Sequence, residues 1–434
     1  MTVWDKSAEC MSAEERRERQ GTALRQLVQR VYRAVPAYRK KMADKGVLPE
    51  HIRSIADLPK LPFTTKDDLR DAYPFGSFAV PNRQIVRLHA SSGTTGRATV
   101  VGYTPADIRL WSEVVARCLV SAGVGADDII QIAYGYGLFT GGLGLHYGAE
   151  QLGATVIPIS GGNTRRQVQL MRDFGTTVLA CTPSYALYLA ETLREMKIPR
   201  SELKLRVGVF GAEPWTEGMR REIEEQLGIT AADIYGLSEI IGPGVSCECT
   251  ERVGLHVQDD HFVPEVIDPD TGRSLGPGQR GELVFTTLTK EALPLIRYRT
   301  HDLTELDNRP CRCGRTTTRM SKCMARTDDM LIIRGVNVFP SQIEAVLLEM
   351  SELAPHYLLV LEREHNLDKL TLLVEANERV FSDSVVQLES FTNRVRGALE
   401  SALGLSLEVK LVEPRTIDRS EGKAKRVLDK RNLM

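Results

Sequence analysis

Residues 178–181 read Val-Leu-Ala-Cys and residues 207–210 read Val-Gly-Val-Phe, and both runs are short and continuously apolar. Two similar runs precede them, at 129–133 and 155–159. Stretches with helical character alternate with these runs, among them 105–122 and 165–174. Continuous apolar runs predict strands buried on both faces, and their alternation with helices predicts βαβ units. The expected fold class is therefore α/β, with a largely parallel sheet.

The chain of 434 residues is longer than one hydrophobic core usually serves, so we expect two domains. An amphipathic helical cover is expected over 13–45, interrupted at Pro36. Short strands and turn signals predict a β-rich subdomain from about 250 to 325. We predict a large N-terminal domain over 1–328 with mixed or parallel sheets, and a small, mobile C-terminal α+β domain over 329–434.

Composition excludes several classes of protein. Charged residues make up 26% of the chain, the net charge is -1 and basic residues are dispersed, so nucleic-acid binding is not expected. No apolar run reaches membrane-spanning length, and the N-terminus has no signal-peptide pattern. The eight cysteines include several isolated ones, which argues against a disulfide framework. We expect a cytoplasmic protein that binds neither nucleic acid nor a membrane.

A turn rich in hydroxyls and glycine follows a short strand expected at 85–88. It reads Ser91, Ser92, Gly93, Thr94, Thr95, Gly96 and Arg97. Backbone N–H groups and hydroxyls in such a loop can surround a polyphosphate, and Arg97 adds positive charge. The Walker A spacing is absent, which disfavours a P-loop nucleotide triphosphatase. On composition alone, a phosphate site and a flexible surface turn are about equally expected.

Five segments, in this order along the chain, resemble motifs of the adenylate-forming superfamily of acyl-CoA synthetases and adenylation domains. They are residues 91–97, Tyr235-Gly-Leu-Ser-Glu239, Tyr298-Arg-Thr-His-Asp302, Arg326-Thr-Asp-Asp329 and Gly422-Lys423. Within the superfamily the chain is most similar to the phenylacetate-CoA ligases, through residues 89–104, 134–148, 159–165, 211–215 and 334–340. The resemblance covers nearly the whole chain.

The resemblance implies an ATP site. The loop at 91–97 would hold the phosphates, Asp302 would accept hydrogen bonds from the ribose hydroxyls, and Glu239 would bind Mg²⁺. The residues that would flank the adenine or otherwise contact the nucleotide are Gly211, Ala212, Glu213, Tyr235 and Gly236.

The resemblance also implies roles near the C-terminal domain. Arg326 would contact the nucleotide, Asp328 would be the hinge, and Lys423 would stabilise charge that develops at the α-phosphate and the carboxylate. On local sequence alone, an ordinary turn at Asp328 and a solvated Lys423 fit as well. Two residues depart from the family pattern, because Arg97 replaces a common lysine and Asp418 replaces a frequent proline. We expect activity to survive both.

The implied reaction has two steps. The acid attacks the α-phosphorus of ATP and releases pyrophosphate, and the thiol of coenzyme A then attacks the acyl carbonyl of the adenylate and releases AMP. Two alternatives stay open: an aryl-adenylating ligase that loads a carrier protein or an amine, and an inactive nucleotide-sensing relative. A homodimer is expected by resemblance only.

The run Tyr-Gly-Tyr-Gly-Leu-Phe-Thr-Gly-Gly at 134–142 is rich in aromatic residues and glycine, which suits a flat and largely apolar acid. An aryl or arylacetic acid is therefore favoured over a fatty acid. Among such acids, the resemblance implies phenylacetate or a close aryl acid. The expected pocket residues, each of which fits a core position equally well, are Tyr136, Phe139, Ala212, Ile240 and Pro243.

Five candidate soft ligands fall in the predicted β-rich subdomain: Cys247, Cys249, His256, Cys311 and Cys313. The four predicted to form a closed Cys₃His zinc site are Cys249, His256, Cys311 and Cys313. The Cys-x-Cys spacing is tighter than that of ordinary zinc fingers, and buried thiols without a metal are about equally expected. Four protein ligands leave no open position, so this zinc would be structural.

Overall fold

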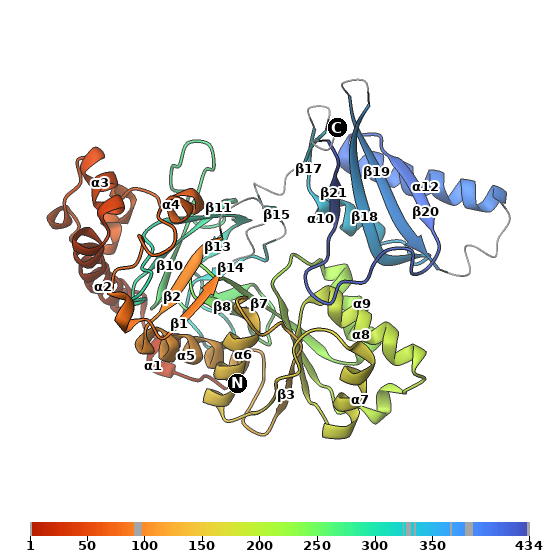
Figure 1. Cartoon of the computed structure of the whole chain (residues 1–434), viewed down its shortest axis with the longest axis horizontal. Helices are drawn as coiled ribbons and strands as arrows, with labels where there is room; N and C mark the ends of the chain where they lie inside the picture. Colours follow the sequence, from red (N-terminus) through yellow and green to blue (C-terminus); the bar gives the residue numbers. More distant parts are fainter. Residues whose placement is uncertain are drawn as a thin grey trace.

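A computed structural model describes residues 2–90, 98–323, 325–326, 331–333, 336–364, 367–377 and 385–431. The chain forms a large α/β part and a smaller C-terminal part that is seated beside it (Figure 1). The smaller part has its own hydrophobic core, built from residues between 331 and 427, whereas several other clusters fill the large part. The predicted hinge, Asp328, lies outside the described residues, and the boundary at 328 stays a prediction.

A sheet of nine strands runs through the large part, in the order β13-β14-β9-β8-β7-β6-β5-β3-β4. Its parallel portion is β3 (Ile129–Ile132), β4 (Thr155–Ile157), β5 (Val178–Cys181), β6 (Val207–Gly211) and β7 (Thr230–Leu237). Its antiparallel portion is β8 (Gly242–Glu248), β9 (Leu255–Val257), β13 (Leu306–Asp307) and β14 (Arg319–Met320). The α/β prediction is confirmed.

Helices cover both faces of this sheet, which explains its continuous apolar strands. Val178 and Ala180 of β5 pack in one core with α5 and α6, whereas Leu179 and Cys181 pack in another with α7, α8 and α9. Side chains alternate along a strand, so the two helix groups lie on opposite faces. The helices are α5 (Pro105–Ser121), α6 (Gly141–Leu152), α7 (Thr164–Phe174), α8 (Pro183–Glu195) and α9 (Glu217–Leu227).

A second, antiparallel sheet joins β10 (Phe262–Ile267), β11 (Gly281–Thr287), β12 (Tyr298–Thr304) and β15 (Ala325–Arg326). The strands between 250 and 325 are thus shared between two sheets, because β9, β13 and β14 extend the nine-stranded one. The hairpin of β1 (Arg87–Ala90) and β2 (Val100–Tyr103) starts two residues later than the expected strand.

Helices cover the N-terminal side of the large part. They are α1 (Lys6–Glu9), α2 (Ala13–Ala34), α3 (Pro36–Asp44) and α4 (Lys66–Asp71), with 3₁₀ turns at Pro49–His51, Ile55–Lys60 and Asn82–Gln84. A further 3₁₀ turn, Arg200–Glu202, lies between α8 and β6. Helices α2 and α3 form the cover predicted over 13–45. Leu24, Leu27 and Val28 of α2 are buried in a cluster that includes Val263 and Ile296. The apolar stripe of α2 therefore attaches this cover to the second sheet.

The smaller part contains both helices and strands, as expected for an α+β domain. The hairpin of β16 (Leu331–Ile333) and β17 (Val336–Val338) precedes α10 (Pro340–Leu347), and α12 (Val385–Leu403) follows later. The four-stranded sheet has the order β20-β19-β18-β21, with β18 (Leu353–Glu364), β19 (Leu367–Ala376), β20 (Glu408–Val412) and β21 (Val427–Asp429). Leu348, just beyond α10, packs against the core of α8 and α9, so the two parts are in contact.

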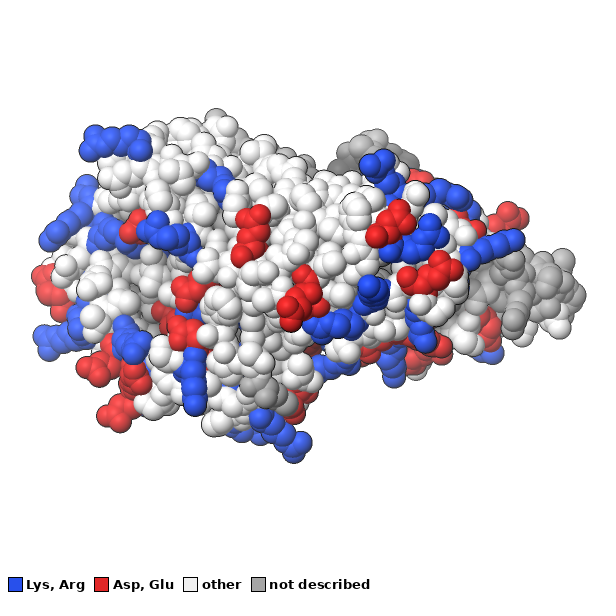
Figure 2. All heavy atoms as spheres, turned by 90° about the horizontal axis from the view of Figure 1, so that it is seen from below, with Lys and Arg blue, Asp and Glu red and all other residues white. Residues whose placement is uncertain are grey.

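Acidic and basic side chains are intermixed over the face shown in Figure 2, without a stripe of one sign. This pattern fits a chain whose net charge is -1. Among the helices within the described ranges, none combines the length and the hydropathy that a bilayer crossing requires.

Candidate functional site

The predicted phosphate loop, Ser91 to Arg97, lies outside the described residues, but its N-terminal flank is placed. The N–H of Ala90 donates to the carbonyl of Leu138 at 3.1 Å, and His89 Nδ1 lies 3.0 Å from the same oxygen. Thr140 Oγ1 is 3.1 Å from Ser238 Oγ. The strand that enters the loop, the predicted acid-pocket run and the 235–239 motif are therefore neighbours.

Asp302 joins two other predicted nucleotide residues. Strand pairing places it opposite Arg326 in the register of β12 and β15. Arg326 donates to Asp302 Oδ1 at 2.8 Å, and the Tyr235 hydroxyl donates to Oδ2 at 2.5 Å. Burial raises the pKa of Tyr235 well above its ordinary value, with Asp302 acting in the same direction, so the phenol remains a donor. Residues from two strands, Tyr235 of β7 and Arg326 of β15, thus hold the carboxylate of β12 in place.

Glu239 is 6% exposed, and a buried lysine fixes its backbone. Lys290 Nζ donates to the Glu239 carbonyl at 3.1 Å and lies 5.0 Å from the ring centroid of Tyr103. Burial lowers the pKa of Lys290 to about 8, although the negative charges of Asp107 and Glu239 act to raise it. Glu239 Oε1 lies 3.8 Å from Lys66 Nζ. Sequence reasoning missed Lys290, because a lone lysine between strands carries no motif.

The ends of β6, β7 and β8 approach too closely for side chains. A Cβ at Gly211 would lie 2.0 Å from the carbonyl oxygen of Ile234, and one at Gly236 would lie 1.9 Å from that of Gly242. Ala212 follows in the left-handed region, at φ 71°. Glycine is therefore required at both positions, and the carboxyl edge of the parallel strands is where α/β sheets commonly bind ligands.

The other side of the site comes from the smaller part of the chain. Lys423 is exposed. Even so, desolvation by the surrounding protein lowers its pKa, and the positive charge of Arg326 lowers it further. The carboxylates of Glu213, Asp302 and Glu239 act on it in the opposite direction. The predicted lysine is therefore near enough to the predicted acids for their charges to act on it, although 120 or more residues separate it from each of them in sequence.

Glu213, predicted to flank the adenine, uses both carboxylate oxygens in hydrogen bonds to backbone. Its Oε1 accepts from the N–H of Ser184 at 2.7 Å, and its Oε2 accepts from the N–H of Ala424 at 2.9 Å. The carboxylate therefore connects the start of α8 to the residue that follows Lys423.

An ionic cluster farther along α8 also joins the two parts. Arg419 Nε lies 3.0 Å from Glu191 Oε2, and Arg419 Nη1 lies 2.7 Å from Glu375 Oε1. His356 Nε2 is 2.7 Å from Glu191 Oε1. Burial would raise the pKa of Glu191, but His356 and Arg419 outweigh it and lower that pKa to about 2. Glu191 carried no signal in the sequence, since its partners lie 165 and 228 residues away.

The five predicted pocket residues are partly brought together. Ile240 is fully buried, and Tyr136 and Ala212 pack against the same core. Pro243 is half-buried, whereas Phe139 is 37% exposed. Their contact with an acid stays a prediction.

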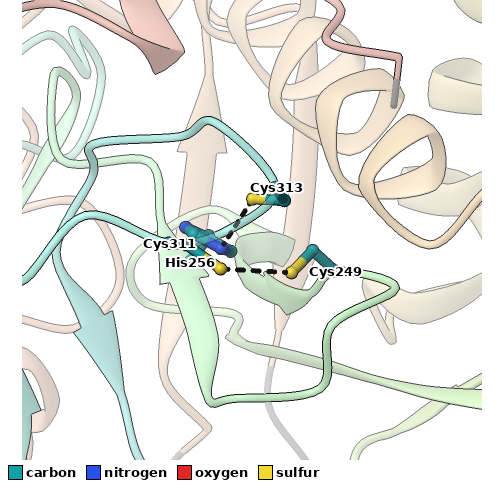
Figure 3. Close-up of side chains that lie close together, drawn as sticks. All are labelled: Cys249, His256, Cys311 and Cys313. Atoms are coloured by element: carbon teal, nitrogen blue, oxygen red, sulfur yellow. Dashed lines mark hydrogen bonds between the residues drawn. The ribbon is translucent and has the colours of Figure 1, made fainter.

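The four predicted zinc ligands converge, as Figure 3 shows. The donor atoms of Cys249, His256, Cys311 and Cys313 are buried and lie within 4.8 Å of one another. Cys249 Sγ is 3.8 Å from Cys311 Sγ, and Cys313 Sγ is 3.4 Å from His256 Nε2. A tetrahedral zinc with bonds of about 2.3 Å to sulfur separates two sulfurs by about 3.8 Å. The spacing of the donors therefore fits a zinc ion.

The residues around this cluster also fit a zinc site. His256 Nδ1 lies 2.9 Å from the hydroxyl of Thr317, which leaves Nε2 directed toward the thiols. Arg315, two residues after Cys313, donates from Nε to Glu9 at 2.5 Å. This ion pair joins helix α1 to the loop that carries Cys311 and Cys313.

Comparison with known proteins identifies the class. Residues 28–288 match the family model described as AMP-binding enzyme, and residues 335–431 match the AMP-binding enzyme C-terminal domain. The chain belongs to the AMP-binding enzymes. It is 52% identical to the phenylacetate-coenzyme A ligase of Thermus thermophilus, over 99% of this chain and 100% of that relative. It is 53% identical to the phenylacetate-coenzyme A ligase of Escherichia coli, over 98% of this chain and 97% of that relative.

This chain is similar to solved structures of 2-hydroxyisobutyryl-CoA ligase, which show that enzyme in two states. The postadenylation state in complex with R3-HIB-AMP has a TM-score of 0.93 at 32% identity, covering 99% of this chain and 93% of that one. The thioesterification state with 2-HIB-AMP and CoA has a TM-score of only 0.73 at 33% identity over the same shares. The two parts of this chain are therefore arranged as in the postadenylation state.

Proposed function

We propose that this enzyme uses ATP to activate an aromatic carboxylic acid, phenylacetate or a close aryl acid, and transfers the acyl group to coenzyme A. The products would be the aryl-CoA thioester, AMP and pyrophosphate. The observation that carries the proposal is identity of 51–53%, over nearly the whole chain, to phenylacetate-coenzyme A ligases of four organisms. The docking of the Lys423 loop against Thr182 and Glu213, where the charges of Asp302 and Glu239 act on the lysine, supports the same chemistry.

Each side chain would act by position and charge. Asp302, fixed by Tyr235 and Arg326, would accept hydrogen bonds from the ribose hydroxyls. Lys423 would stabilise negative charge as the carboxylate attacks the α-phosphorus and pyrophosphate leaves. Preorganisation of this kind suits a reaction in which the protein forms no covalent bond.

Glu239 would hold Mg²⁺. A nearly buried carboxylate at the edge of the nucleotide site fits an ion that binds one or two carboxylates together with phosphate oxygens and water. When bound, the ion would neutralise charge on the polyphosphate.

Acid-dependent exchange of labelled pyrophosphate into ATP tests the first step, and loss of free coenzyme A thiol tests the second. We expect both with phenylacetate or a close aryl acid. Exchange without thiol consumption would instead support transfer to a carrier protein or an amine, and absence of exchange across a panel of aromatic acids would support a nucleotide sensor.

We also propose a structural zinc bound by Cys249, His256, Cys311 and Cys313. Protein purified without added metal should contain about one zinc per chain, and Cys311→Ser should lose it. Loss of a structural metal removes binding free energy from folding, so the variant should unfold several degrees lower. Cys10→Ser, which changes a cysteine outside the four, is the control and should keep its zinc. Metal-free protein of unchanged stability would contradict the proposal.

The family resemblance further motivates a homodimer. Sedimentation equilibrium should then give twice the chain mass of 48.3 kDa. A single species at the chain mass would reject the dimer without affecting the catalytic proposal.

A further inference from the structure

We propose that Glu213 is a positioning residue that seats the Lys423 loop for adenylation, rather than a residue that binds the adenine. The inference rests on the proposed function, because it assigns Glu213 to one of the two half reactions.

The backbone on both sides of Lys423 is held by the large part of the chain. On one side, the carbonyl of Gly422 accepts a hydrogen bond from Thr182 Oγ1 at 3.0 Å. On the other, the N–H of Ala424 donates to Glu213 Oε2 at 2.9 Å. Two fixed points that flank a single residue restrict the direction in which its side chain leaves the loop.

Glu213 is itself anchored. Its second oxygen accepts from the N–H of Ser184 at 2.7 Å, in the first turn of α8. Thr182, which binds Gly422, caps the same helix through the N–H of Tyr185. The loop is thus attached to a rigid helix end, through a carboxylate whose hydrogen bonds are strengthened by its charge.

The loop also fits closely against a glycine turn. A Cβ at Gly161 would lie 3.0 Å from the carbonyl oxygen of Glu421, and one at Gly162 would lie 2.8 Å from Glu421 Oε2. Gly162 has φ 88°, a backbone conformation that favours glycine. The seat for residues 421–424 therefore consists of the turn at 161–162, the start of α8 and Glu213.

This seat joins two parts of the chain that must separate if the enzyme alternates between its half reactions. The chain matches the postadenylation state of 2-hydroxyisobutyryl-CoA ligase much better than the thioesterification state, at TM-scores of 0.93 and 0.73. A rotation of the smaller part would carry Ala424 away from Glu213. Glu213 should then matter for adenylation and not for thioester formation.

The alternative role makes a different prediction. A residue that flanks the adenine contacts the nucleotide in both half reactions, so its loss should weaken ATP binding and also slow thioester formation from the adenylate. A residue that seats Lys423 should lower the kcat of adenylation with little change in the KM for ATP.

The test compares Glu213→Gln with the wild type, with Lys423→Ala and with Glu225→Gln, which changes an exposed glutamate on α9. Pyrophosphate exchange measures adenylation, and thioester formation from synthetic phenylacetyl-adenylate and coenzyme A measures the second step. We expect Glu213→Gln to lower exchange about 100-fold, the scale of a 1 Å misplacement, and to leave thioester formation within about twofold. Equal losses in both steps, or a raised KM for ATP with unchanged kcat, would overturn the inference.

Two further measurements keep the inference testable if Glu213→Gln folds poorly or if the wild type proves inactive. Ala424→Pro removes the N–H that donates to Glu213, so it should produce the same selective loss of pyrophosphate exchange. Amide hydrogen exchange in the ligand-free protein should be faster across residues 420–426 in Glu213→Gln than in the wild type. If amide hydrogen exchange across residues 420–426 is the same in Glu213→Gln as in the wild type, the seat is refuted. If the wild type is inactive but its residues 420–426 are protected from amide hydrogen exchange, only the proposed function is refuted.

Discussion

The two halves of the candidate site are built differently. Asp302 belongs to the large part, where the adjacent strand β15 supplies its partner Arg326 and strand β7 of the other sheet supplies Tyr235. Lys423 arrives from the smaller part, on a loop of exposed residues held by hydrogen bonds to Thr182 and Glu213. The first arrangement persists whenever the large part is folded, whereas the second exists only while the two parts are docked. A site of this kind can keep its nucleotide while it exchanges its catalytic cation.

Of the changes considered, removal of the Lys423 ammonium group should have the largest effect on activity. Lys423→Ala should lower pyrophosphate exchange by roughly 10²- to 10³-fold, because the charge on the α-phosphate loses a preorganised partner. Thioester formation from synthetic adenylate should be nearly unchanged, since that step proceeds after the loop has left. The comparison of the two halves fails if both steps slow together or if exchange is retained.

Asp302→Asn should affect both steps, each by about tenfold or more. Asparagine replaces one acceptor oxygen with an amide that faces Arg326 or Tyr235, so a hydrogen bond is lost and the unfolding free energy should fall by about 1–3 kcal/mol. Kinetics of the two half reactions and urea unfolding measure these effects. A loss restricted to adenylation would show that Asp302 belongs functionally with Lys423.

The smallest effect should come from the ionic cluster at Glu191. Glu191→Gln leaves the nucleotide residues untouched but weakens docking through Arg419 and His356, so exchange should fall roughly fivefold, or about 1 kcal/mol. Glu225→Gln serves again as the control for charge loss. An unchanged rate would show that the cluster does not contribute to docking.

The same residue provides a pH test. The pKa of Glu191 is lowered to about 2 in the folded chain, so its ionic contribution is complete above the ordinary glutamate pKa, about 4.3. That contribution is lost as the pH falls toward 2. Urea unfolding between pH 5 and pH 3 should therefore show a steeper loss of stability in the wild type than in Glu191→Gln. Parallel curves would mean that the carboxylate is not held by its cationic partners.

Local patterns were sufficient for much of the fold. The runs at β5 and β6 predicted buried strands because both faces of those strands are covered, so every residue had to be apolar. Local patterns could not predict that β9, β13 and β14 join the nine-stranded sheet rather than the second sheet. β9 pairs with β14, whose Arg319 lies opposite His256, and no local period encodes such a distant partner.

The site divides in the same way. Residue type and spacing were enough to select Cys249, His256, Cys311 and Cys313 from five candidates, and the structure brings all four together. Cys247 packs instead in the main core. The resemblance to adenylate-forming enzymes pointed to Asp302, Arg326 and Lys423. It also assigned Glu213 to the adenine, which stays a prediction. What it could not indicate is that both carboxylate oxygens of Glu213 accept hydrogen bonds from backbone N–H groups.

By itself, the sequence determined the α/β class and the family, and it predicted residues for the chemistry, because apolar periodicity and motif spacing are local properties of a chain. The tertiary structure alone decided which groups meet Lys423, what Glu213 holds and how Glu191 joins the two parts. The contacts of Glu191 with His356 and Arg419, and that of Glu213 with Ala424, link residues more than 150 positions apart. They form only when two separately built cores dock, and the geometry of that docking is a property of the folded surfaces.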